Sequence, residues 1–355
     1  MTHATALSGT FPAIGDVAGH PVVMHYGDSA REYAALRSGA MLVDRSARGR
    51  LRLSGSKAAE MLTGLVTNDV QSLAPGQGMY AAALSPKGKI VADIRIFCDS
   101  DGVLTDAPPR ATVGWITMVR KYVNPRLAPY REPTETRVLG LFGPKARAIA
   151  EALIGPQAES LAALAPYAHF NAVVGGENAM IARVPDLEIE GYEFFVTERV
   201  FVDAWQRLTS AGATPAGLLA WEIARIEAGR PEWGLDIDDS TIPQEANFDE
   251  LHAISYTKGC YVGQEVVARV HFRGHVNKHL RGLLCGHTDP PPAKAELFDD
   301  AGKHVGDVRS TALSPRLGAI ALATARREIE PGTTLTVRWP EGDARADLLH
   351  LPFPL

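Results

Sequence analysis

A single thiol stands in a glycine-flanked segment, where residues 256–265 read YTKGCYVGQE. Gly259 and Gly263 around Cys260 allow a sharp backbone bend or the close approach of another group. A nearby ammonium from Lys258 would lower the pKa of the thiol and make it reactive. Cys260 could then act as a nucleophile, a metal ligand or a redox switch, whereas a buried cysteine is often only a small apolar filler. The residues alone leave these four roles open.

Two further segments place a charged side chain beside an apolar stripe. In KIVADIRIF, residues 89–97, alternation predicts a strand with Asp93 on the face away from the aliphatic side chains. Asp93 then lies either in solvent or in a cleft, where it could accept hydrogen bonds from a heterocycle. In WEIARIEAGRPEWG, residues 221–234, Arg225 lies off the buried stripe near a helix end. Its guanidinium either completes the helix dipole or binds a ligand carboxylate through two hydrogen bonds.

Basic side chains concentrate just after the cysteine segment. Residues 269–281 hold seven of them, and Gly274 and two β-branched valines favour an extended strand there. Alternate members would share one face of that strand and attract an anionic ligand. Three histidines have helical spacing, but a strand disfavours the helix that a zinc site would need. We therefore expect no metal site, and no Walker A, GxGxxG or HExxH pattern occurs in the chain.

The composition is that of an ordinary globular protein with a slight acidic excess. The 355 residues carry a formal net charge of -5, a length that fits two or three domains and a charge that does not favour nucleic-acid binding. Three cysteines without a CxxC pair predict a reducing compartment. No apolar stretch approaches the ~18 residues of a membrane span, and the N-terminus lacks a basic start followed by an apolar run. We expect a cytoplasmic protein that binds neither nucleic acid nor membranes.

The elements that position these side chains recur in two similar halves. Residues 50–122 and 138–228 are each predicted to run strand, helix, strand, strand, helix. This order is typical of split βαβ (ferredoxin-like) units, with helices on one face of an antiparallel sheet. Ahead of them, Ser29 and Glu32 predict a capping box for a helix that ends at Gly39. Beyond His275, short strands separated by turns predict a small barrel or sandwich.

KGCYVGQE resembles the signature of the YgfZ-type folate-binding proteins, which are similar to aminomethyltransferase, the T-protein of the glycine cleavage system (GcvT-like). LVDRSARGRLRLSG, TIPQEANFDE and SPRLGAIALA also resemble blocks of this superfamily, so the likeness spans nearly the whole chain. It implies an α+β fold of three domains around a central hole that binds tetrahydrofolate. The expected boundaries are 1–130, 131–275 with the cysteine motif, and 276–355 for a C-terminal β-barrel. Ala92 replaces a T-protein aspartate, and the T-protein lacks the cysteine motif; both departures favour the YgfZ-type group.

The resemblance also implies roles for individual side chains. The implied folate-binding positions are Tyr80, Asp93, Glu193, Arg225, Trp233, Tyr261 and Gln264. Asp93 would hydrogen-bond the pterin and Arg225 would bind the glutamate tail. Cys260 would lie at the cavity rim as a thiolate, and Lys258 would help to keep it ionised.

Three functions are compatible with this resemblance. The first is a tetrahydrofolate-binding factor in iron–sulfur cluster assembly or repair. Cys260 would work there with an assembly protein or a client enzyme, because one thiolate cannot hold a cluster unaided. The second is a folate-dependent aminomethyltransferase that releases ammonia from an aminomethyl-lipoyl carrier, with Asp93 activating the folate nitrogen. The third is a non-catalytic folate sensor or scaffold, and the sequence leaves open whether any turnover occurs.

Overall fold

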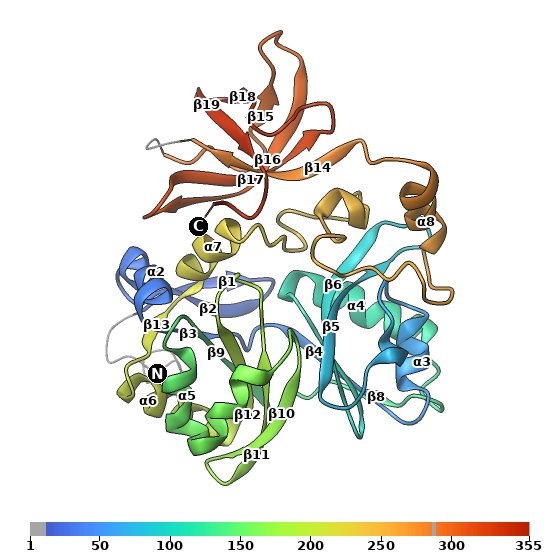
Figure 1. The fold of residues 1–355 in the computed structure, drawn as a ribbon, viewed down its shortest axis with the longest axis vertical. Coiled ribbons are helices and arrows are strands. Elements are labelled where there is room, and N and C mark those ends of the chain that lie inside the picture. The colour runs from blue at the N-terminus through green and yellow to red at the C-terminus, as the bar shows by residue number, and fades with distance from the viewer. Residues whose placement is uncertain (1–11, 286–288, 355) are drawn as a thin grey trace.

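The chain folds into two α+β halves that lie side by side beneath a β-barrel (Figure 1). The computed structural model describes residues 12–285 and 289–354. The first eleven residues, where we expected no targeting signal, lie outside this part. Each half has helices on one face of its sheet, and the opposite faces meet at the centre, where Tyr80 and Phe97 pack in one cluster with Val138 and Phe195. Functional side chains on these inner faces are therefore buried between the halves.

The first sheet has the strand order β5-β6-β7-β4-β8, and its paired strands run antiparallel. Its strands are β4 (Gly49–Ser54), β5 (Gln77–Leu84), β6 (Ile90–Asp99), β7 (Gly102–Ala107) and β8 (Tyr130–Arg131). Helices α3 (Ala58–Thr63) and α4 (Pro109–Tyr122) cover the face that carries Ile94 and Ile96. The opposite face of β6 carries Asp93 and Arg95, which are also buried. Strand β7 lies where the sequence predicted no element.

The second sheet has the order β10-β11-β12-β9-β3-β13. Its strands are β3 (Met41–Asp44), β9 (Thr136–Phe142), β10 (His169–Val174), β11 (Glu177–Arg183), β12 (Gly191–Thr197) and β13 (Thr214–Ala216). Helices α5 (Ala146–Ile154) and α6 (Glu198–Ser210) pack on one face, and the 3₁₀ turn η2 (Gly155–Ala163) follows α5. Strand β3 pairs antiparallel with β9 and parallel with β13. This sheet therefore combines a strand from before residue 130 with strands from after it. The domain boundaries stay a prediction.

The N-terminal part forms a separate hairpin and one helix. Strands β1 (Ala13–Val17) and β2 (His20–His25) make the hairpin, and α2 (Ser29–Ser38) follows. The predicted capping box is wrong, because Asp28 is the N-cap and accepts hydrogen bonds from the backbone N–H groups of Ala30 and Arg31. Glu32 instead accepts from the backbone N–H groups of Tyr26 and Gly217, at 2.6 and 2.9 Å. The helix ends at Gly39 as predicted.

The C-terminal strands close into a six-stranded barrel, so the predicted α+β fold with a terminal β-barrel is confirmed. The closed order is β14-β17-β16-β15-β18-β19. The strands are β14 (Lys278–Leu284), β15 (Glu296–Phe298), β16 (His304–Ser314), β17 (Gly318–Arg326), β18 (Thr334–Trp339) and β19 (Gly342–Leu349). Helix α7 (Leu218–Glu227) lies between the second sheet and the barrel (Figure 1), and Trp221 and Ile226 join a core cluster that includes Leu322 of β17.

The cysteine segment leads into a helix rather than the predicted strand. After the short turn η3 (Pro243–Ala246), α8 runs from Gln264 to Arg273. Gly263, with a φ of 80°, reverses the chain before α8, and Val267 anchors the helix as a fully buried side chain. The strand prediction was wrong because β-branched valines lower helix propensity only slightly, and tertiary packing overrides them. Within the described ranges, no helix is long and apolar enough to cross a membrane, and no three His, Cys, Asp or Glu side chains are grouped to hold a metal.

Candidate functional site

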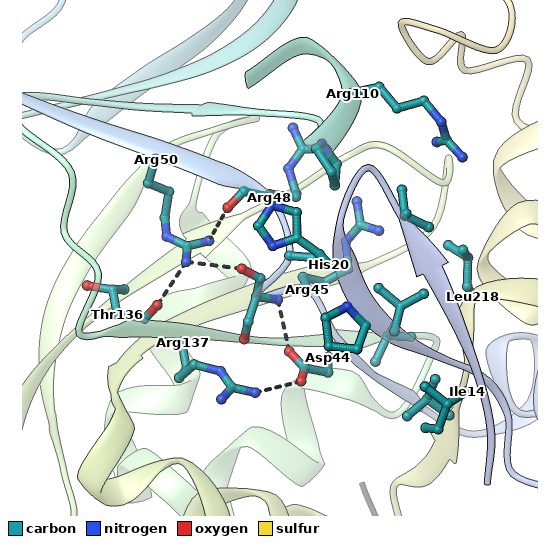
Figure 2. A pocket seen from close by; sticks show the side chains of 18 of the residues that line it. Ile14, His20, Asp44, Arg45, Arg48, Arg50, Arg110, Thr136, Arg137 and Leu218 are labelled. Atoms are coloured by element: carbon teal, nitrogen blue, oxygen red, sulfur yellow. Dashed lines mark hydrogen bonds and ion pairs between the residues drawn. The ribbon is translucent and has the colours of Figure 1, made fainter. Parts of the chain in front are cut away.

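A ligand-sized cavity lies between the N-terminal hairpin and the turn that joins β3 to β4 (Figure 2). Its volume is about 530 Å³, within the range of about 300 to 1,000 Å³ that is usual for small-molecule sites. We call it the outer cavity. Ile14, Val17 and Val22 of the hairpin and Leu218 of α7 supply an apolar wall. Polar side chains line the rest, so the cavity can accept a molecule with one flat apolar part and one charged part.

The charged lining of the outer cavity is dominated by arginine. Five arginines face three carboxylates there: Arg45, Arg48, Arg50, Arg110 and Arg137 against Asp44, Glu198 and Glu232. Three of the arginines form close ion pairs with acids. Arg110 contacts Glu232 at 2.9 Å, Arg137 contacts Asp44 at 2.9 Å, and Arg48 contacts the buried Asp106. Arg45 has only a longer ion-pair contact, 3.6 Å to Glu193, and Arg50 contacts no carboxylate, so the positive charge of this lining is least neutralised at these two side chains.

The Arg45 side chain is buried and makes no hydrogen bond to the described residues. Its side chain is 8% exposed, its guanidinium stacks on the Trp221 ring at 3.6 Å, and its Nε is a buried donor with no acceptor. The nearest acid in ion-pair range, Glu193, lies 3.6 Å from that Nε. Burial and the neighbouring Arg48 charge lower the pKa of Arg45 to about 10. An anion bound beside Arg45 would therefore relieve an unfavourable charge.

Arg50 is held by backbone oxygens rather than by a carboxylate. Its Nη1 donates to the carbonyl of Arg48 at 2.9 Å, and its Nη2 donates to the carbonyls of Ser46 and Thr136 (Figure 2). Its Nε is a second buried donor without a partner in the described structure. Carbonyls fix the position of the guanidinium but do not cancel its charge, so Arg50 also adds positive potential to the outer cavity.

A second, much smaller cavity adjoins the first, and both share Arg45, Arg48 and Glu232. Its volume of about 20 Å³ has room for about one water molecule. We call it the inner cavity. Its lining includes Tyr80 and Asp93, which were predicted to contact folate. The side chains that surround it already bond to one another, so the described conformation leaves no space for a pterin ring.

Arg95 fills the centre of the molecule and uses all five of its N–H groups. It forms a two-point ion pair with Glu193, at 2.9 and 2.7 Å, and donates twice to Asp106, at 3.1 and 2.8 Å. Asp186 lies 3.5 Å from its Nη1. Although burial opposes ionisation, Arg48 and Arg95 lower the pKa of Asp106 to about 2. Glu193, predicted to bind folate, is thus part of a buried ion network.

Asp93 and Tyr80 line the inner cavity, as does Arg225, and Trp233 contacts Asp93. The Tyr80 hydroxyl donates to Asp93 Oδ2 at 3.1 Å, and the Trp233 backbone N–H donates to Asp93 Oδ1 at 3.3 Å. The Arg230 guanidinium covers the Tyr80 ring at 3.8 Å. Burial raises the pKa of the Asp93 carboxyl. The structure therefore brings three predicted folate contacts together, but their polar groups bond to the protein.

Arg225 has no donor left for a ligand. Its Nη1 donates to the Arg230 carbonyl and to Asp236, at 2.7 and 2.6 Å. Its Nη2 donates to Glu222 and to Ser310 of β16, at 2.5 and 2.9 Å, and its Nε also donates to Glu222. These contacts satisfy all five guanidinium N–H groups. Arg225 therefore ties α7 to the following loop and to the barrel.

Comparison with known proteins identifies the family. Residues 10–255 match the GCVT N-terminal domain, and residues 278–353 match the glycine cleavage T-protein C-terminal barrel domain. The chain belongs to the glycine cleavage T-protein family. Aminomethyltransferase of Nostoc sp. is 31% identical over 316 residues, which cover 86% of this chain and 82% of the relative. Aminomethyltransferase of Rippkaea orientalis is 30% identical over 334 residues, or 91% of this chain and 88% of the relative.

A solved T-protein shares the whole fold. The crystal structure of the glycine cleavage system aminomethyltransferase T from Bartonella henselae superposes with a TM-score of 0.87 at 21% identity. The match covers 99% of this chain and 96% of that one. This likeness supports the fold, and the matches to the two family domains and to the relatives confirm the predicted T-protein superfamily. The YgfZ-type assignment stays a prediction.

In this T-protein-family chain, the cysteine motif lies apart from both cavities. Lys258, Cys260, Tyr261 and Gln264 line neither the outer nor the inner cavity. The Lys258 ammonium donates to the carbonyl of Thr63, the last residue of α3, and to those of Val66 and Asn68. Its three hydrogens are therefore used, and none is left for the thiolate.

The motif nevertheless holds its cysteine in a defined place. Tyr261 is buried beneath the Lys258 ammonium, which lies 4.7 Å from its ring centroid, and Gln264 begins α8. Cys260 is exposed. The anchored neighbours thus present Cys260 at the surface.

Sequence reasoning missed the arginines that build the outer cavity. Arg45, Arg48 and Arg50 fall within six residues of one predicted family block, LVDRSARGRLRLSG. Three arginines so close together in the sequence could have indicated a binding site for an anion. Their spacing matches neither a helix nor a strand, because two of the three residues lie in the turn between β3 and β4.

Proposed function

We propose that this T-protein-family member binds a reduced folate in the outer cavity and acts in iron–sulfur cluster assembly or repair. The observation that carries the folate proposal is a cavity of about 530 Å³ with two arginines, Arg45 and Arg50, whose buried Nε donors have no hydrogen-bond partner among the described residues. A folate has a flat ring system and a dicarboxylate tail, so its shape and charge suit the apolar hairpin wall and the arginine-rich wall. When bound, tetrahydrofolate supplies nitrogens that carry one-carbon groups.

Cys260 is the group that we propose for the iron–sulfur role. It is exposed, while Lys258 and Tyr261 beside it are anchored in the first half. An exposed thiol on a fixed segment can meet a partner protein, which would complete the ligand set of a cluster. Because the motif residues line neither cavity, action on a partner is favoured over action on the bound folate.

Folate-dependent aminomethyl transfer is the second candidate, because the curated relatives are named aminomethyltransferase. Asp93 would have to meet the reacting folate nitrogen for this activity. The inner cavity of about 20 Å³ and the bonds of Asp93 to Tyr80 and Trp233 leave no space for that contact in the described conformation. This candidate therefore requires Arg95, Arg230 or Tyr80 to move.

A paired experiment separates the candidates. We expect 5-formyltetrahydrofolate to bind the purified protein in calorimetry. In cells that lack the gene, the native protein should restore iron–sulfur enzyme activity, whereas Cys260→Ala should not. Full rescue by Cys260→Ala would contradict the thiol role and favour a folate sensor or scaffold. Ammonia release from an aminomethyl-lipoyl carrier would establish the transferase instead.

A further inference from the structure

The anionic end of the ligand needs a binding site other than Arg225, because every guanidinium N–H group of Arg225 already has a protein partner. The resemblance assigned the folate glutamate to Arg225, but all five N–H groups of that guanidinium have protein partners. Releasing them would leave Asp236 and Glu222 without their main cation, and Asp236 is buried. Removing one partner of a buried ion pair is strongly unfavourable. A ligand carboxylate is therefore better served by donors that the protein leaves unused.

Arg45 supplies such donors from a rigid setting. Its backbone N–H donates to the Val138 carbonyl at 2.9 Å, and the Ser46 hydroxyl accepts from the Val138 N–H at 2.9 Å. The Trp221 ring holds the guanidinium from one side. Arg45 is thus fixed before any ligand arrives, so an anion could bind it at little cost in side-chain entropy.

We infer that Arg45 and Arg50 form an anion site in the outer cavity that binds the carboxylates of the ligand. The flat part of the ligand then packs on the hairpin wall around Val17 and Val22, and Arg225 serves only to hold the loop that follows α7. The identity of the ligand as a folate rests on the proposed function. The anion site itself rests on the Nε donors of Arg45 and Arg50, which make no hydrogen bond to the described residues, and on a cavity lining with more arginines than carboxylates, in which Arg45 meets Glu193 only at 3.6 Å.

The test uses the charged half of folate alone. We expect p-aminobenzoylglutamate, which has the dicarboxylate but no pterin, to bind the native protein in calorimetry and to bind more weakly as salt is raised. Arg45→Gln should weaken binding about 10- to 100-fold, the value of a lost charge-assisted hydrogen bond. Arg45→Lys should recover part of that loss. Arg50→Gln gives a second, independent reading if Arg45→Gln folds poorly.

Arg52 offers a matched control on the same strand as Arg50. It forms a two-point ion pair with Asp99, at 2.5 Å on both sides, and lines neither cavity. Arg52→Gln should bind as the native protein does. Native affinity in both Arg45→Gln and Arg50→Gln would overturn the inference. Binding of p-aminobenzoylglutamate without binding of 5-formyltetrahydrofolate would keep the anion site and reject the folate.

Discussion

At the scale of single residues, the three cysteines differ in access to solvent. Cys260 is exposed, whereas Cys98 and Cys285 are buried. Burial raises the pKa of both buried thiols, that of Cys285 to about 11. Because the thiolate is the reactive form, the raised pKa and the burial of Cys98 and Cys285 both oppose their reaction, and Cys260 is the accessible thiol in the described part of the chain.

This contrast predicts the stoichiometry of thiol labelling. One thiol per native chain should react rapidly with a disulfide reagent at pH 8, and three should react in denaturant. Cys260→Ser should abolish the rapid phase and leave the melting temperature unchanged, since an exposed side chain contributes little to stability. A rapid phase that survives Cys260→Ser would show that a buried cysteine is reached in the native state.

Lys258 is expected to stabilise the motif rather than activate its thiol. Burial lowers the pKa of Lys258 to about 8, so the amine stays largely protonated at neutral pH and keeps its three carbonyl contacts. Lys258→Met should lower the free energy of unfolding by about 2–4 kcal/mol, because it leaves carbonyls without a donor. Lys87→Met, at an exposed turn position, should change it by less than about 0.5 kcal/mol in the same urea titration. Equal effects of the two substitutions would contradict this role.

The sequence predicted the direction of Asp93 but not its surroundings. Alternation along β6 places Asp93 and Arg95 opposite Ile94 and Ile96, as the structure has them. Whether that second face meets solvent depends on the other sheet, whose strands come much later in the chain. The same holds for Arg225, whose partners include Ser310 of the barrel. One segment carries no information on such distant partners.

At the scale of elements, the hairpin forms the apolar wall of the outer cavity and rests on the start of α7. A Cβ added at Gly217 would lie 2.4 Å from the carbonyl carbon and oxygen of Met24 in β2. The Glu32 carboxylate stabilises this contact between the hairpin and α7 by accepting hydrogen bonds from the backbone N–H groups of Tyr26 and Gly217. The glycine therefore lets the hairpin lie close against the helix.

Gly217→Ala should push the hairpin away from α7. We expect a loss of about 1–3 kcal/mol in the free energy of unfolding, as for overpacking in a core, and weaker binding of 5-formyltetrahydrofolate. Gly259→Ala is the control, because a Cβ there meets nothing within 4 Å. Unchanged stability and binding in Gly217→Ala would show that the hairpin moves without cost.

Helix α8 shows where local pattern misleads. Valines and a terminal glycine favoured a strand, yet Gly263 starts a helix that Val267 fastens to the core. His271, in the last turn of the helix, then stacks on Tyr256 with ring centroids 3.6 Å apart. Packing against residues outside the window decided the element, as it often does for short helices.

At the scale of the whole molecule, buried ion pairs join the two halves. Arg95 of β6 in the first sheet binds Asp106 of β7 and Glu193 of β12 in the second. The order of elements predicted two α+β units and a barrel, and that architecture is confirmed. The pairing of β3 with β9 could not be predicted, because it joins residues 41–44 to 139–142 across the entire first sheet.

Asp106 predicts how acid affects this junction. Its folded pKa of about 2 lies below the ordinary value of 3.8, so its stabilising contribution is present above pH 4 and is lost as the pH falls toward 2. The shift corresponds to about 2 kcal/mol. Asp106→Asn should cost about 3–5 kcal/mol at pH 7, because it leaves Arg48 and Arg95 underpaired.

Urea unfolding at pH 7, 4 and 3 checks this prediction. The difference between the native protein and Asp106→Asn should shrink as the pH falls. Asp101→Asn, which changes an exposed carboxylate in the neighbouring turn, should show no such trend. A difference between native and Asp106→Asn that is independent of pH would contradict the assigned charge state.

The central claim is that the arginine-lined outer cavity binds a reduced folate through its carboxylates. Calorimetric titration of 5-formyltetrahydrofolate into the native protein and into Arg45→Gln tests it most directly. The account predicts one site per chain in the native protein and an affinity about 10- to 100-fold lower in the variant. No heat of binding in the native protein, or equal affinity in both proteins, would contradict it.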